Sequence, residues 1–136
     1  MPETTTTASL VLRKLLTGTG YTPPTWNVGL STTTISDSGV GATEPSGNNY
    51  ARKTMGSDSW TIAEDSIISN ASQILFSEAS GSGWGTIKEI FISNTGSVIC
   101  FHQSLTPNII VNGGTTVVIP PECLVIKRDS TSYETE

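Results

Sequence analysis

The sequence predicts an all-β fold, an antiparallel β-sandwich or barrel-like domain, with one short N-terminal helix and polar terminal arms. Three observations support this fold class. Strand-like runs recur about every 8–12 residues in the second half of the chain, which is the spacing of such domains. Turn sequences rich in Gly and Asn separate these runs. Charged residues make up only 14% of the chain, and Ser and Thr, which suit the solvent-facing sides of strands, take their place.

A chain of 136 residues has room for a single domain. Its two ends, residues 1–7 and 129–136, are polar and show no periodicity, so we expect them to be arms that become ordered against a partner. A short helix is expected over residues 8–17, and the β-domain over residues 26–128.

The helix is predicted from apolar residues that recur at helical spacing between positions 8 and 16. A Thr can cap its start and Gly18 can end it. A helix this short is not stable alone, so it must dock on its own sheet or on a neighbouring subunit. The residues expected to make this contact are Val11, Leu12, Leu15 and Leu16.

The first half of the β-domain holds four strand signals. Residues 26–31 alternate apolar and polar side chains, as in a strand with one buried face. Residues 50–55 and 60–62 are typical of short edge strands, and residues 72–77 predict a further strand.

The second half is more regular. Asn94-Thr95-Gly96 and the NGG sequence at 112–114 are turn signals between apolar runs, and the first of them predicts a hairpin. The strands expected here are 86–93, 98–105, 108–111, 115–119 and 123–127.

No set of residues suggests catalysis, a cofactor site or a metal site. The single histidine, His102, lies within a predicted strand, where we expect it half in the core or facing a partner. Glu64 and Asp65 are adjacent, so they would point to opposite faces of a strand or simply solvate a turn. The cysteines Cys100 and Cys123 make no zinc spacing with the histidine.

We interpret both cysteines as buried thiols, because each lies in an apolar run. A disulfide between Cys100 and Cys123 remains an alternative if their strands are neighbours, although a reducing cytoplasm disfavours it. The sequon Asn70-Ala71-Ser72 is interpreted as a chance match, because the N-terminus lacks the charge order of a secretory signal.

The net charge of −5 argues against a nucleic-acid partner, because phosphate contacts need clustered Lys and Arg. No apolar run approaches the ~20 residues of a membrane span. We therefore expect neither nucleic acid nor membrane among the partners.

The aromatic residues allow two interpretations. Trp26 and Trp60 lie in alternating patterns, which favours the core. Trp84 lies in the glycine-rich sequence GSGWG and is therefore the best candidate for an exposed contact. Together with Tyr50 it could form a surface on which a glycan stacks, but a structural role is favoured for both.

Much of the chain resembles a group of small tailed-bacteriophage virion proteins, usually labelled tail-fibre or minor structural proteins. The resemblance runs from about Ala8 to Ile126. It is carried by the short helix and by several sequence stretches: TPPTWNVGLSTTTISDSGVGATEPSGNNYARK, ILFSEASGSGWGTIKEIFI and SLTPNIIVNGGTTVVIPPECLVI.

This resemblance implies a non-enzymatic β-rich component of the virion, assembled in the host cytoplasm. By analogy with other phage proteins we expect a homo-oligomer, most simply a homotrimer. The compact domain with two arms favours a capsid decoration or cement protein bound to the major capsid protein. The alternative is a tail-fibre or tail adaptor component, which could also bind a host receptor or glycan.

The stretch GVGATEPSGNNYAR, residues 39–52, is then interpreted as a connector. Glu44-Pro45 would extend the chain, Ser46 to Asn49 would turn it, and Tyr50 would anchor the next strand. We expect Arg52 to pair with an acid or a carbonyl, in its own domain or across a subunit boundary. Tyr50, Arg52 and Trp84 complete the candidate partner-contact residues.

Overall fold

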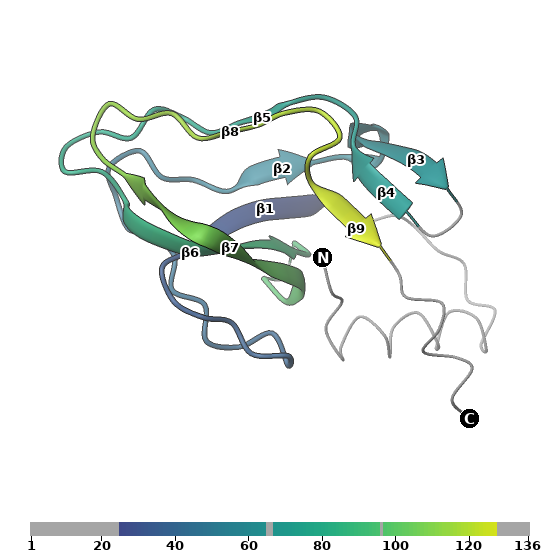
Figure 1. Cartoon of the computed structure of the whole chain (residues 1–136), viewed down its shortest axis with the longest axis horizontal. Helices are drawn as coiled ribbons and strands as arrows, with labels where there is room; N and C mark the ends of the chain where they lie inside the picture. Colours follow the sequence, from purple (N-terminus) through teal and green to yellow (C-terminus); the bar gives the residue numbers. More distant parts are fainter. Residues whose placement is uncertain (1–24, 65–66, 96, 128–136) are drawn as a thin grey trace.

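The computed structural model describes residues 25–64, 67–95 and 97–127. The predicted helix over residues 8–17 and the arms at 1–7 and 129–136 lie outside these ranges. The described chain is built from antiparallel β-strands in a sandwich-like arrangement, which confirms the β-rich part of the predicted fold (Figure 1). Within these residues, no helix is long and apolar enough to cross a membrane.

One layer of the sandwich is a four-stranded sheet in the order β2-β1-β6-β7. In β1, Asn27 to Ser31 pair with Glu89 to Ser93 of β6, and β7 forms an edge of the sheet. The strands are β1 (Trp26–Ser31), β2 (Lys53–Met55), β6 (Gly85–Ser93) and β7 (Ile99–Val111).

Two smaller sheets form the opposite layer, one with the order β3-β4-β9 and one pairing β5 with β8. A single 3-10 turn, η1, joins β2 to β3 within the described part of the chain. These elements are η1 (Ser57–Ser59), β3 (Trp60–Glu64), β4 (Ile67–Asn70), β5 (Ile74–Leu75), β8 (Val118–Ile119) and β9 (Val125–Lys127).

The main core lies between the two layers. Apolar side chains from β1 and β6 pack there against the loops and short strands of the opposite layer. Burial of this apolar area is the main force that holds the layers together. Its buried members include Val28, Leu30, Phe76, Trp84, Ile90, Ile92 and Leu124.

The four-stranded sheet is also buried on its other side, which we call the outer face: Gly29, Ser31, Glu89, Phe91 and Ser93. All but Gly29 are at most 1% exposed, so the prediction of a strand with one buried face is wrong for β1. The reason is that the chain between β1 and β2 folds back over this side, where Ile35 packs with Phe91 and Ile99 in a second, smaller cluster.

Several strands differ in length from the prediction. The predicted strands 98–105 and 108–111 form one strand, β7, because an irregularity in its pairing with β6 accommodates the residues between Ser104 and Ile109. The expected strands 72–77 and 115–119 shorten to β5 and β8, and 50–55 shortens to β2. The strand β4 was not predicted.

Asn70 of the sequon is fully buried at the end of β4. Its Nδ2 donates to the carbonyl oxygens of Ser72 and Pro120, and its Oδ1 accepts from the Leu124 backbone at 2.9 Å. The side chain therefore fastens the chain before β9 to the end of β4, which is a structural use of this residue.

Candidate functional site

Two glycine-containing turns are joined at one end of the sandwich. The first is the turn from Gly47 to Tyr50, where the Tyr50 amide donates to the Gly47 carbonyl. The second is the turn from Ser80 to Gly83, where the Gly83 amide donates to the Ser80 carbonyl. Asn48 links the two turns, because its Nδ2 donates to the Gly83 carbonyl at 2.8 Å. The predicted turn before Tyr50 is thus confirmed.

Trp84 lies beneath these turns and is only 5% exposed. Its Nε1 donates to the Asn48 carbonyl at 2.8 Å, and its ring packs edge-on against Tyr50 and Phe76. The structural role favoured for Trp84 is confirmed, and the alternative of an exposed contact is wrong, because its glycine neighbours let the chain turn while the indole enters the core. Trp84 and Tyr50 therefore form no exposed stacking surface.

Arg52, Glu44 and Tyr50 form a polar cluster, which we call the clamp. Arg52 binds Glu44 through two nitrogens, with Nε 2.9 Å from Oε1 and Nη2 2.7 Å from Oε2. Such a forked pair is stronger and more directional than a single contact. The expected pairing of Arg52 with an acid is confirmed, and the acid belongs to its own domain.

The clamp reaches the outer face of the four-stranded sheet. Arg52 Nη1 donates to Ser93 Oγ at 3.0 Å, and its guanidinium lies 5.2 Å from the centre of the Phe91 ring. The Tyr50 hydroxyl accepts from the Leu30 amide and donates to Glu44. The segment before β2 is thereby fixed across β1 and β6.

The clamp also shifts the pKa values of its members. Burial raises the pKa of Glu44, but hydrogen bonds from Arg52 and Tyr50 outweigh burial and leave it below its ordinary value. The pKa of Tyr50 is raised, first by burial and then by its hydrogen bond to Glu44. The hydrogen bond to Glu44 raises the pKa of Arg52.

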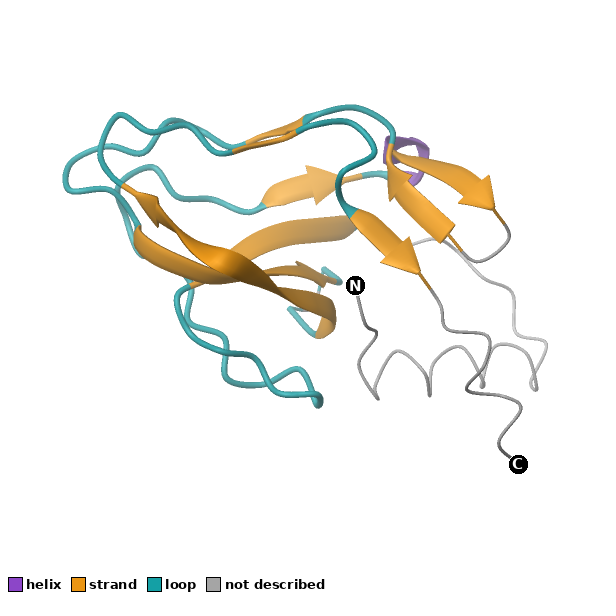
Figure 2. Ribbon diagram, in the orientation of Figure 1, coloured by secondary structure: helices purple, strands orange, loops and turns teal. Residues whose placement is uncertain are grey.

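Residues 32–43 form a hairpin-like loop that extends away from the sandwich, and we call it the projecting loop (Figure 2). Its two arms are held together by backbone bonds from Thr32 to Thr43 and from Ser36 to Val40. Thr33 Oγ1 adds a bond to the Gly41 carbonyl. Its surface is rich in hydroxyl groups, and Val40 is 64% exposed near its end.

A buried carboxyl group attaches the projecting loop to the sheet. Glu89 of β6 is 1% exposed, and its Oε2 accepts from the Ile35 amide at 2.6 Å. Its Oε1 lies 2.8 Å from Nδ1 of His102 on β7. The predicted position of His102, within a strand and partly in the core, is confirmed. His102 is the second hydrogen-bond partner of the Glu89 carboxyl group. The alternation of apolar and polar residues in β6 did not indicate that this carboxyl group is buried.

The described residues contain no group of three or more His, Cys, Asp or Glu side chains placed to hold a metal ion. Neither cysteine forms a disulfide. Cys100 is buried as expected, whereas Cys123 is exposed, because it follows the Pro120-Pro121 break and precedes the first residue of β9.

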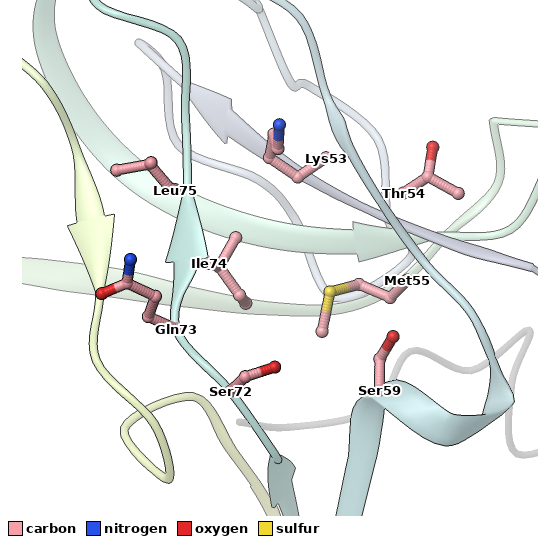
Figure 3. Close-up of a pocket in the computed structure, with 8 residues that line it drawn as sticks. All are labelled: Lys53, Thr54, Met55, Ser59, Ser72, Gln73, Ile74 and Leu75. Atoms are coloured by element: carbon pink, nitrogen blue, oxygen red, sulfur yellow. The ribbon is translucent and has the colours of Figure 1, made fainter.

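Two hollows on the surface of the described residues are shallow. One, of about 170 Å³, lies between β2 and β5, where Figure 3 shows the Met55 side chain reaching between Ile74 and Ser59. The other, of about 270 Å³, is lined mainly by apolar residues of β6, β7 and the segment 119–125. Both are smaller than the ~300–1,000 Å³ typical of small-molecule sites, so neither is assigned a ligand.

Exposed aliphatic side chains occur at several places besides Val40. Ile109 and Ile110 lie near the end of β7, and Ile62 and Ile68 lie on β3 and β4. The predicted contact residues Val11, Leu12, Leu15 and Leu16 lie outside the described residues. Tyr50 and Arg52 are brought together in the clamp, and Trp84 adjoins Tyr50 from the core side.

Comparison with curated proteins finds no match to the chain. A protein family described as Podophage GP4 fiber I protein gp80 matches residues 3–127. This match covers all of the described β-domain and most of the whole chain. The chain therefore belongs to the family of the Podophage GP4 fiber I protein gp80, a family of phage structural proteins.

Proposed function

We propose that this protein is a non-enzymatic structural component of a podophage tail fibre. The observation that carries the proposal is the family match over residues 3–127, since the family description names a fibre protein. This favours the tail-fibre alternative over capsid decoration, which the compact domain and its arms had suggested.

The architecture is suited to a fibre protein that binds other protein chains. The strand β7, which is 13 residues long, forms an edge of the four-stranded sheet, and such edges pair readily with other chains. Its sequence, ICFHQSLTPNIIV, contains no Asp, Glu, Lys or Arg, so a second strand meets no fixed charge of those types there.

The projecting loop supplies a second contact surface. Its base is fixed by Glu89, and the clamp holds the chain that follows it. A loop that is already ordered loses less conformational entropy when it binds. We assign it to contacts with neighbouring fibre or tail proteins.

Labelling of intact particles tests this function. Antibodies raised against the β-domain are bound to purified phage and located by electron microscopy. We expect label on the fibres at the tail end of the particle. Label spread over the capsid surface would show instead that the protein decorates the head.

The proposed homo-oligomer is measured separately. The mass of the purified chain in solution, determined by light scattering or native mass spectrometry, is expected to be three times the 14.4 kDa of one copy. A mass of 14.4 kDa at all concentrations would remove self-association from the proposal.

A further inference from the structure

An apolar stripe on the sheet of β3, β4 and β9 extends from the core to the exposed surface, and it consists of Ile126, Ile68 and Ile62. Ile62 of β3 lies directly opposite Ile68 of β4, which lies opposite Ile126 of β9. Residues that pair in this way point to the same face of a sheet. Ile126 packs against the main core, whereas Ile68 is 37% and Ile62 is 73% exposed.

The same face carries Trp60, two residues before Ile62, and Trp60 also packs against the main core. The part of this face with Trp60 and Ile126 therefore belongs to the interior, whereas the part with Ile62 and Ile68 extends beyond the core. The three strands lie at one end of the molecule in Figure 1, beside the start of β1, so the four-stranded sheet covers only part of their inner side. Two isoleucines on adjacent strands are left facing solvent.

We propose that the apolar face of residues 8–17 covers Ile62 and Ile68 of the same chain. This segment carries Val11, Leu12, Leu15 and Leu16 at helical spacing, with Arg13 and Lys14 on the opposite side. A ten-residue helix is roughly 15 Å long, and three strands span roughly 10 Å. One such helix therefore matches the stripe in size as well as in chemistry.

The position of β1 favours this occupant over a second copy of the chain. Only residues 18–25 separate the segment from Trp26, the first residue of β1. Trp26 pairs with Met55, which is followed by η1 and β3, and both Trp26 and Trp60 pack against the main core. An eight-residue connection reaches at most roughly 28 Å, and it holds the segment at a high effective concentration beside the stripe.

Limited proteolysis provides the first test. Trypsin cleaves after Arg13 and Lys14, and docking protects these bonds. In Ile62→Asp we expect cleavage there to be about ten times faster, because proteolysis follows the population of the open form. The control is Val40→Asp, which places the same charge on another exposed aliphatic position and should leave the cleavage rate unchanged.

Tryptophan fluorescence reports whether the β-domain of each variant stays folded. Equal cleavage of the wild-type chain and Ile62→Asp would overturn the proposal.

Disulfide cross-linking tests the proposal independently if Ile62→Asp does not fold. In a Cys123→Ser background, Ile62→Cys is combined with Leu12→Cys or with Leu15→Cys, and Arg13→Cys replaces these partners as the control.

We expect a disulfide within one chain for the Leu12 or Leu15 variant and none for the Arg13 control. A mixture of ¹⁵N-labelled and unlabelled chains distinguishes a disulfide within one chain from a disulfide between two copies, because a link between copies gives peptides of mixed label. Mixed-label links would assign the stripe to a second copy, and no link in either pair would remove the segment as its occupant. Both results contradict the proposal.

Discussion

Gly29 shows how the absence of a side chain leaves room for the Phe91 ring on the outer face of the four-stranded sheet. A Cβ atom at this position would lie 2.3 Å from Cζ of Phe91. We expect Gly29→Ala to lower the free energy of unfolding by about 1–3 kcal/mol, the usual cost of an overpacked core. Urea unfolding followed by tryptophan fluorescence measures the change.

Gly56→Ala is the matched control, because its Cβ would meet only the Asp58 carboxyl group at 3.3 Å. Its effect should be within about 0.5 kcal/mol, as for surface substitutions. A second change, Phe91→Leu, should return part of the stability lost in Gly29→Ala. If the double variant is simply the sum of the two single losses, the contact between Gly29 and Phe91 does not explain the effect.

Tyr50 gives the fold a dependence on alkaline pH. Its pKa is raised above the ordinary value of 10.0, first by burial and then by its bond to Glu44. A raised pKa means that the protonated phenol stabilises the fold fully below pH 10, and that this contribution is lost as pH rises further. Thermal unfolding should therefore show a falling Tm above about pH 10.

The variant Tyr50→Phe isolates this effect. It should have a lower Tm at neutral pH, because the hydroxyl bonds to Leu30 and Glu44 are lost, but a smaller alkaline decline. Equal alkaline declines in the two proteins would mean that other groups cause the loss. Glu44 acts at the other end of the pH scale: its pKa is lowered, so its contribution is lost as pH falls through that value.

Individual roles were only partly predictable. The kind of partner that Arg52 binds was predictable, because a base beside a turn needs an acid or a carbonyl nearby, but the sequence did not identify it as Glu44. The burial of Trp84, Glu89 and Asn70 was not, because each depends on a segment distant in sequence. The Trp84 indole donates a hydrogen bond to the Asn48 carbonyl. The Ile35 amide donates to the Glu89 carboxylate, and the Leu124 amide donates to the Asn70 side chain.

At the scale of elements, we expect Glu89 to order the projecting loop, because it accepts a hydrogen bond from the Ile35 amide. Glu89→Ala leaves the Ile35 amide without its acceptor, and an unsatisfied buried group costs about 1–3 kcal/mol. We expect faster hydrogen exchange in residues 32–43, with little change in the amides shared by β1 and β6. Mass spectrometry of exchanged peptides measures both.

The exposed residue Glu78 provides the control, and Glu78→Ala should leave loop exchange unchanged. Glu89→Gln keeps an oxygen that can accept from Ile35 and should fall between the wild-type protein and Glu89→Ala. Unchanged loop exchange in Glu89→Ala would show that the Ile35 cluster alone orders the loop.

The predicted strands were most accurate where turns and alternation agreed. β1 starts and ends as predicted, and β6 differs by one residue at its start, because each follows a glycine- or proline-rich break. β7 was predicted as two strands, since Pro107 normally interrupts pairing. The bulge opposite β6 lets the strand continue, and no local pattern could reveal it.

At the scale of the whole molecule, the described residues leave the edge of β7, the projecting loop and the stripe of Ile62 and Ile68 open. Strand spacing and turn chemistry predicted the all-β sandwich-like class. They could not show which surfaces remain open, because this depends on how far each layer covers the other.

The central claim is that the protein is built into the fibre of the virion. Its most direct test separates DNA-filled heads from tails with their fibres and quantifies the chain in each fraction by mass spectrometry. We predict the chain in the tail fraction, in numbers comparable to other tail proteins. A chain recovered with the heads, in numbers comparable to the major capsid protein, would contradict the account.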